Sequence, residues 1–131
     1  MKVYKTREFA RLCRNASVAD WDLCEAAERA EKGLVDASIG KFLIKQRIAR
    51  RNEGRSGGFR AIVFHGHGDR AVFLHLFAKN ERSNLTRAEQ DAYRDIAKEL
   101  ADLTIDQIRA LVDRQKWIEI DYESFRKKTP K

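Results

Sequence analysis

Three strand-like segments follow one another in the middle of the chain, and they constrain its fold more than any other feature of the sequence. The first, residues 42–49, alternates with a period of two, so that Lys45 and Arg47 fall on one face and the isoleucines fall on the other. The second and third, residues 59–65 and 70–77, are joined by a short glycine-containing hairpin turn. Because short connections join antiparallel neighbours, these segments predict a small antiparallel sheet.

Helical patterns lie on both sides of these strands. Residues 2–6 are expected to form a short strand, and the apolar spacing after it predicts two helices, of which the second ends at Gly33. Two more helical patterns follow the sheet, and residues 117–122 then form either a further short strand or a docking arm. Capping boxes predict where three of the helices begin, at Ser17–Asp20, Thr86–Glu89 and Thr104–Gln107.

The order of these elements, βααβββα with an added C-terminal helix and arm, predicts an α+β domain. We expect the N-terminal strand and the helical hairpin to pack on the small antiparallel sheet. The chain has 131 residues, which is enough for one hydrophobic core. We assign residues 1–102 to this domain and residues 103–131 to a helix and basic tail that pack on it or extend from it.

The net charge of the chain is concentrated on the same strands and their connections. Residues 41–82 carry ten Lys and Arg residues against three Asp and Glu residues, a difference that equals the formal charge of the whole chain, +7. A basic surface on a folded sheet is typical of proteins that bind a polyanion, usually a nucleic acid. The alternative is a basic surface that only aids solubility.

The composition does not call for a cofactor or a metal ion. Cys13 and Cys24 fall in helical patterns and are expected to be reduced core residues, and the three histidines lack a recognisable ligand spacing. No apolar run approaches the ~20 residues of a membrane span, and the first residues lack the apolar stretch of a signal peptide. We therefore expect a cytoplasmic protein with no membrane partner.

The middle of the chain contains four motifs: Lys-Gln-Arg-Ile-Ala-Arg (45–50), Arg-Ser-Gly-Gly-Phe-Arg (55–60), Gly-Asp-Arg-Ala-Val-Phe (68–73) and Phe-Ala-Lys-Asn-Glu-Arg (77–82). They resemble the RelE/HigB toxins of bacterial type II toxin–antitoxin pairs, and this resemblance spans roughly residues 17–101. Its specific part is the run from Arg55 to Arg82, and the Lys-Asn-Glu ending of this run is closer to the HigB-like branch than to the founding RelE type. The resemblance implies a RelE-like fold and a toxin that inhibits translation.

The resemblance also implies an activity and its partners. Toxins of this family typically enter the ribosomal A site and cut the mRNA there, and a cognate antitoxin neutralises them. We therefore expect a ribosome-dependent endoribonuclease (an mRNA interferase) that needs no metal and binds mRNA, the ribosome and an antitoxin. Some relatives poison DNA gyrase instead, so the alternatives are a toxin of the same fold that binds an acidic protein target, and a degenerate binding module. The sequence does not predict the oligomeric state.

Arg60 is the strongest candidate site residue. It follows Ser-Gly-Gly, where the family places its phosphate-binding Arg, and a guanidinium grips a phosphate through two N–H groups, which Lys cannot do. Lys45 and Arg47 match the paired basic residues of the family, and Lys45 is a candidate proton carrier because neighbouring cations disfavour its charge. The other candidate catalytic residues are Lys79, Glu81 and Arg82, and the candidate RNA-binding residues are Arg50, Arg51, Arg55, Arg70 and Asn80.

Three further positions bear on the chemistry. The best-known relatives have a catalytic Arg where this chain has Asn80 and a Tyr where it has Thr86, which is explained here as a helix cap. Glu81 either acts as a base or, more simply, orients a neighbouring Arg. His75 is expected at the edge of the core, with Phe73 and Phe77 on its own face of the strand.

Overall fold

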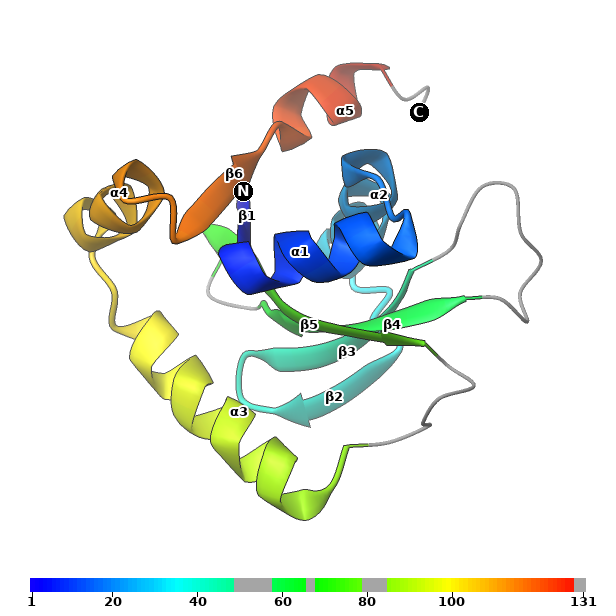
Figure 1. Cartoon of the computed structure of the whole chain (residues 1–131), viewed down its shortest axis with the longest axis vertical. Coiled ribbons are helices and arrows are strands. Elements are labelled where there is room, and N and C mark those ends of the chain that lie inside the picture. The colour runs from blue at the N-terminus through cyan, green and yellow to red at the C-terminus, as the bar shows by residue number, and fades with distance from the viewer. Residues whose placement is uncertain (49–57, 66–67, 79–84, 129–131) are drawn as a thin grey trace.

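The computed structural model describes residues 1–48, 58–65, 68–78 and 85–128, which form one six-stranded sheet with helices on both faces (Figure 1). Along the sheet the strands are ordered β2-β3-β4-β5-β1-β6. The elements in chain order are β1 (Lys2–Thr6), α1 (Arg7–Ala16), α2 (Asp20–Glu31), β2 (Ala37–Gly40), β3 (Leu43–Ile48), β4 (Phe59–Phe64), β5 (Arg70–Ala78), α3 (Arg87–Ala101), α4 (Ile105–Asp113), β6 (Trp117–Ile120) and α5 (Tyr122–Lys128).

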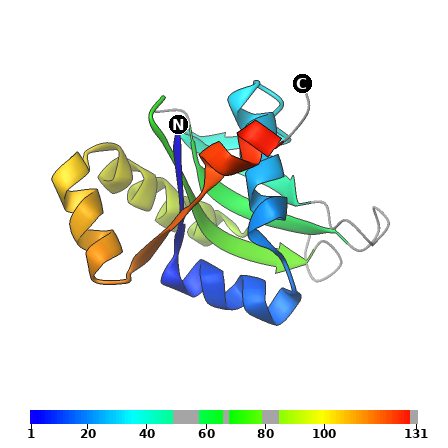
Figure 2. The same cartoon turned by 90° about the horizontal axis from the view of Figure 1, so that it is seen from above.

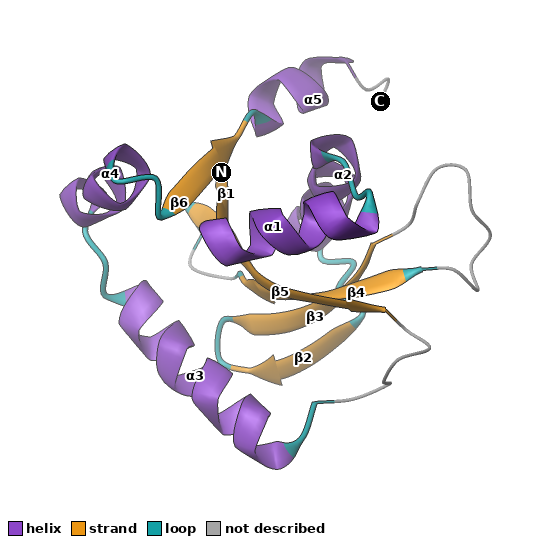
Figure 3. Cartoon of the chain, viewed as in Figure 1, coloured by secondary structure: helices purple, strands orange, loops and turns teal. Residues whose placement is uncertain are grey.

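The α+β class and the antiparallel β3-β4-β5 meander are confirmed, but the sheet as a whole is mixed (Figure 3). The N-terminal strand β1 pairs in parallel with β5, with Lys2 opposite Arg70, and antiparallel with β6. The predicted antiparallel sheet is therefore extended, because β1 joins the edge of the meander in parallel with β5. The sequence also did not predict β2, a four-residue edge strand that pairs with β3.

The two faces of the sheet are buried in two separate hydrophobic clusters, and each has its own helices (Figures 1 and 2). On one face α1, α2 and α5 pack through residues such as Phe9, Leu23 and Phe125. On the other face α3 and α4 contribute Leu100 and Ile108 to a cluster that contains residues of β1, β3, β4, β5 and β6. We call the second face the α3 face after the longer of its two helices. It also carries the candidate site.

Local signals locate most helix ends correctly. Both Thr capping boxes are confirmed: the side chain of Thr86 accepts from the backbone N–H of Glu89 (3.2 Å), and that of Thr104 accepts from Gln107 (3.1 Å). Gly33, at a φ of 84°, follows the end of α2 as predicted. The prediction of a capping box that begins at Ser17 was wrong, because Ser17 ends α1 in a left-handed conformation at a φ of 57°.

The C-terminal segment joins the domain through a strand and a helix. Residues 117–120 form strand β6 rather than a docking arm, and β6 extends the sheet beyond β1. The helix α5 was not predicted, and it packs on α2 by an edge-on contact between Trp21 and Phe125, whose ring centroids are 4.5 Å apart. The hydroxyl of Tyr122 donates to Glu31 at 2.7 Å. This segment therefore helps to close the face that holds α1 and α2.

Both cysteines lie in the core as predicted, and their thiols are expected to be unreactive in the folded protein. Burial raises the pKa of Cys13 to about 12 and that of Cys24 to about 11, so almost no thiolate forms at neutral pH. We expect titration with Ellman's reagent at pH 8 to detect neither thiol in native protein and both after denaturation. Fast modification of the native protein would contradict the buried positions.

Candidate functional site

Three basic residues of the neighbouring strands β3 and β4 lie together on the α3 face. They are Lys45, Arg47 and Arg60, and we call them the basic face. Lys45 and Arg47 come from β3, and the predicted alternation of this strand is confirmed, because Leu43 on the same side belongs to the α3-side cluster. Arg60 of β4 lies directly opposite Arg47 in the strand register, and Lys45 lies opposite Ile62. The sheet therefore brings together three of the predicted site residues.

Arg60, in the basic face, is not neutralised by a described residue in the way that Arg29 is. Like charges directly opposite each other on antiparallel strands are destabilising, and Arg47 and Arg60 are such a pair. Among the residues that the structure describes, Arg60 forms no ion pair, and its guanidinium donates a long hydrogen bond (3.5 Å) to the carbonyl of Phe59. Arg29, by contrast, pairs with Glu25 at 2.7 Å. The arrangement suits binding of an external anion.

Seven other predicted site residues belong to segments that follow β3 and β5 in the chain. Ile48 and Ala78 are the last described residues before residues 49–57 and 79–84, and both pair with Phe59. The predicted site residues that lie outside the described residues are Arg50, Arg51, Arg55, Lys79, Asn80, Glu81 and Arg82.

A β-bulge in β5 adds His75 to the α3 face beside the basic face. Val63 pairs with Phe73 but Ile62 pairs with His75, so Leu74 is an extra residue in β5. The bulge reverses the alternation, which places His75 in one row with Ile62 and Lys45 and places Phe73 in the cluster under the opposite face. The expectation that Phe73 shares the face of His75 was therefore wrong, whereas Phe77 does share it.

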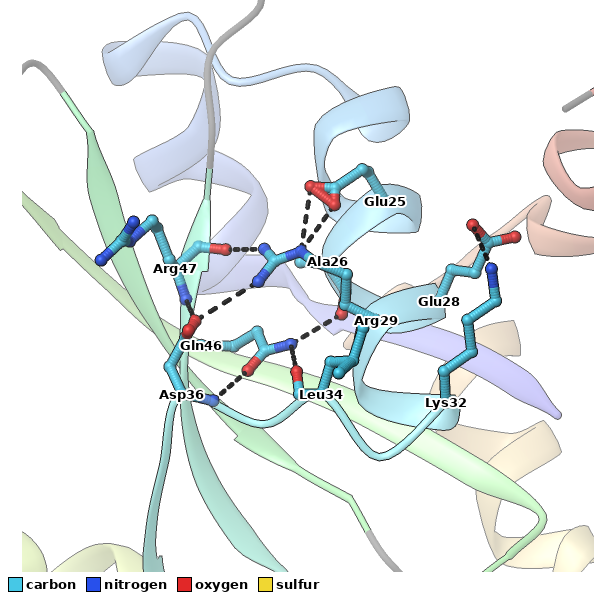
Figure 4. A network of polar contacts seen from close by, with 9 residues as sticks. All are labelled: Glu25, Ala26, Glu28, Arg29, Lys32, Leu34, Asp36, Gln46 and Arg47. Carbon is cyan, nitrogen blue, oxygen red and sulfur yellow. Dashed lines mark hydrogen bonds and ion pairs between the residues drawn. The ribbon is translucent and has the colours of Figure 1, made fainter. Parts of the chain in front are cut away.

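A buried glutamine fixes the strand that carries Lys45 and Arg47 (Figure 4). Gln46 points to the opposite face, is 1% exposed, and is surrounded by backbone groups of α2 and the loop after it. Its amide nitrogen donates to the carbonyls of Ala26 (3.0 Å) and Leu34 (3.1 Å), and its amide oxygen accepts from the N–H of Asp36 (3.0 Å). The sequence analysis did not identify this role, because polar residues in a strand give no signal of their partners.

The same network holds the backbone of Arg47. The carboxylate of Asp36 accepts from the N–H of Arg47 at 2.5 Å, and Arg29 donates to the carbonyl of Arg47 (Figure 4). Arg29 also contacts Asp36 at 3.4 Å and Glu25 through its Nε. Both backbone groups of Arg47 are thus fixed from the α2 side, while its side chain is exposed on the α3 face. Such support preorganises a binding residue.

The side chain of Arg70, a candidate RNA-binding residue, is part of the fold. Arg70 is 7% exposed and forms a two-pronged pair with Asp69, both hydrogen bonds being 2.9 Å long. It also donates to the carbonyls of Leu103 (2.8 Å) and Leu100 (3.5 Å), beyond and at the end of α3. Arg70 thereby ties the start of β5 to the connection between α3 and α4, a contact between residues far apart in the sequence.

An Arg70→Met variant is expected to lose about 2 kcal/mol of unfolding free energy, because it removes the 2.8 Å hydrogen bond to the Leu103 carbonyl, the longer one to Leu100 and the pair with Asp69. We expect its activity per folded molecule to stay within about three-fold of wild type, since Arg70 lies away from the basic face. Urea unfolding followed by circular dichroism measures the first quantity. A selective loss of RNA binding at unchanged stability would instead support the original expectation.

Other features of the described residues bear on the class of site. No group of three His, Cys, Asp or Glu residues that would hold a metal ion occurs among them. None of the helices in these residues is both long and apolar enough to span a membrane. A groove of about 630 Å³ lies between α3 and β5, and Leu74, Tyr93, Ile96 and Trp117 contribute to its lining.

Comparison with known proteins gave one family. The model of the family described as the RelE toxin of the RelE/RelB toxin–antitoxin system matches residues 1–120. The match thus runs from β1 to the end of β6 and leaves out only α5 and the last residues. A comparison with curated proteins gave no match.

Proposed function

Because this chain belongs to the RelE family of toxins of toxin–antitoxin systems, we propose that it is an endoribonuclease that cuts mRNA in the A site of the ribosome. The observation that carries this proposal is the strand register, which sets the like charges of Arg47 and Arg60 opposite each other with Lys45 on the same face. A fold accepts such repulsion where an anion is bound, and the anion here is the RNA backbone.

The basic face supplies the electrostatic part of RNA cleavage. When a 2′-oxygen attacks the adjacent phosphorus, negative charge builds up on the phosphate, and fixed cations stabilise it more than water does. In our proposal Arg60 grips the two non-bridging oxygens of the scissile phosphate. Arg47 and Lys45 hold the neighbouring part of the backbone, and Lys45 is close enough along β3 to exchange a proton with a reacting oxygen.

The residues outside the described part complete the proposed site. Lys79 and Arg82 are proposed to contact the same RNA from the end of β5, and Glu81 to orient one of these cations or act as a base. Arg50, Arg51, Arg55 and Asn80 are proposed to contact flanking nucleotides. Support for this grouping comes from the pairing of Ile48 and Ala78 with Phe59, since both segments then start at the same end of the sheet.

The antitoxin is proposed to neutralise the toxin by covering the basic face. Three cations on one surface favour a partner with acidic or occluding segments. Such a partner prevents RNA from reaching Arg60 without any change in the fold. We expect cytoplasmic action, because translating ribosomes are the proposed target.

Primer extension in a reconstituted translation system tests the proposal. Wild-type protein with a reporter mRNA is expected to give cuts at codon-phased positions with ribosomes, and far weaker cleavage of the same RNA without them. The cleavage is expected to need no metal ion beyond the magnesium that keeps the ribosomes intact. Absence of cuts under every condition would contradict the nuclease, and inhibition of gyrase supercoiling in a parallel assay would then assign the toxin to the other target.

A further inference from the structure

His75 is the one imidazole that the described strands place beside the basic face, and its position depends on the β-bulge at Leu74. Without the extra residue, regular alternation would turn His75 toward α1 and α2. With it, His75 lies two strands from Lys45 in the same row, with Ile62 between them, and lies diagonal to Arg60 on the neighbouring strand. Side chains in such diagonal positions are about 7–8 Å apart at their origins. A phosphate held by Arg60 is therefore within reach of the ring.

Aromatic rings restrict what the imidazole can do. The ring of His75 stacks with that of Phe77 at 6.2 Å and 25°, and the ring of Tyr93 from α3 lies 6.1 Å away at 33°. His75 is half-buried, and Tyr93 lines the groove between α3 and β5. These neighbouring rings occupy space beside the imidazole that a nucleobase would need in order to stack on it. This arrangement favours proton transfer over stacking on a base.

We propose that His75 is a catalytic residue of this site and acts as its general base, an inference that rests on the proposed endoribonuclease function. The neutral imidazole takes the proton of the 2′-hydroxyl as the 2′-oxygen forms a bond to phosphorus. The bond from phosphorus to the 5′-oxygen breaks, and the 5′-oxygen takes a proton from water. The products are a 2′,3′-cyclic phosphate and a 5′-hydroxyl, and the imidazolium then returns its proton to solvent.

The charges around His75 favour a base over an acid. Lys45, Arg47 and Arg60 lie on the same face of the sheet as His75, and a cluster of positive charges suits a group that enters the reaction neutral and accepts a proton. On the helix side the titratable groups are Tyr93 and Glu89, one turn earlier. The carboxylate of Glu89 accepts from the N–H of Thr86 at 2.9 Å, so this negative charge is engaged by the helix cap.

Single-turnover cleavage of mRNA on programmed ribosomes, measured from about pH 5.5 to 8.5, tests the proposal. Wild type is expected to show a rate that rises through the range in which imidazole titrates and then levels off. In His75→Gln the rate at neutral pH is expected to fall by about 100-fold, and the remaining rate is expected to increase steadily with pH because hydroxide replaces the base. A wild-type rate that is flat over this range would overturn the base role without the need for any variant.

Two controls distinguish a general base from a general acid and from the mere loss of an imidazole. His65→Gln is the matched control, because His65 follows the end of β4 that is farther from Arg60. Burial lowers the pKa of His65, and its replacement is expected to leave the pH profile unchanged. An mRNA with sulfur in place of the scissile 5′-oxygen has a leaving group that needs no acid. If this substrate restores the rate of His75→Gln, His75 is an acid and the proposal is overturned; no restoration is expected.

The outcomes also distinguish this proposal from the function on which it rests. If wild type does not cut mRNA on ribosomes, the endoribonuclease itself is contradicted. If wild type cuts and folded His75→Gln, checked by its thermal unfolding midpoint, keeps the wild-type profile, only the role of His75 is overturned. A uniform decrease at every pH would show that His75 acts through packing against Phe77 and Tyr93, which also overturns the base role.

Discussion

Arg60→Ala is expected to lower mRNA cleavage on programmed ribosomes by about 1,000-fold or more and to abolish growth inhibition in cells. The guanidinium is proposed to contact the phosphate on which charge develops, and the loss of one such group commonly costs two to three orders of magnitude or more. The free energy of unfolding is expected to stay within about 0.5 kcal/mol of wild type. It can even rise slightly, because the change removes the repulsion between Arg60 and Arg47 on the opposite strand.

Two further variants make the Arg60 result specific. Arg60→Lys keeps the positive charge but loses the two-pronged grip, so we expect it to recover only a small part of the activity. Arg114→Ala removes an exposed arginine at the end of α4 and is expected to cleave like wild type, which controls for net charge. Wild-type cleavage by Arg60→Ala would remove Arg60 from the site. An unfolded Arg60→Ala protein would show that the side chain is needed for the fold.

The features that the sequence predicted correctly depend on neighbouring residues only. Thr86, Thr104 and Gly33 were located because a cap is formed within four residues of the position that it caps. The same reasoning failed at Ser17, where two short-range patterns compete. The chain there has to leave α1 before it enters α2, and Ser17 takes the left-handed conformation that ends α1. The N-cap of α2 is therefore Ala19, two residues later than the predicted Ser17, and its N–H donates to the carboxylate of Asp22.

The candidate site was only partly predictable, because it depends on which strands pair and in which register. Alternation correctly placed Lys45 and Arg47 on one face, since this property belongs to a single strand. That Arg60 lies opposite Arg47 follows from the β3–β4 register, and no local pattern specifies it. The bulge that turns His75 is likewise a property of the pair β4 and β5. The contacts of Arg70 within the fold were not predicted, because its partners Leu100 and Leu103 lie 30 and 33 residues away.

Gln46→Leu is expected to have the opposite profile to Arg60→Ala, with a loss of about 3 kcal/mol of unfolding free energy and little loss of activity per folded molecule. Leu fills a similar volume but leaves the carbonyl of Leu34 and the N–H of Asp36 without this partner and removes the second hydrogen bond to the carbonyl of Ala26, and each of these losses costs about 1 kcal/mol or more. Chemical unfolding monitored by circular dichroism measures the loss. Cleavage at low temperature, where the variant stays folded, is expected to remain within about three-fold of wild type.

Gln46→Glu separates the hydrogen bonds from the packing, because it keeps the acceptor for Asp36 and changes only the donor. A carboxylate in this buried position faces the carbonyls of Ala26 and Leu34, so its protonated form is favoured in the folded state. The folded protein then binds a proton more tightly than the unfolded chain. The stability deficit is therefore expected to be largest at neutral pH and to shrink as the pH falls.

If Gln46→Leu instead matched wild type in stability while losing activity, the network would act on the orientation of Arg47 rather than on the fold, and Asp36→Ala should reproduce that loss.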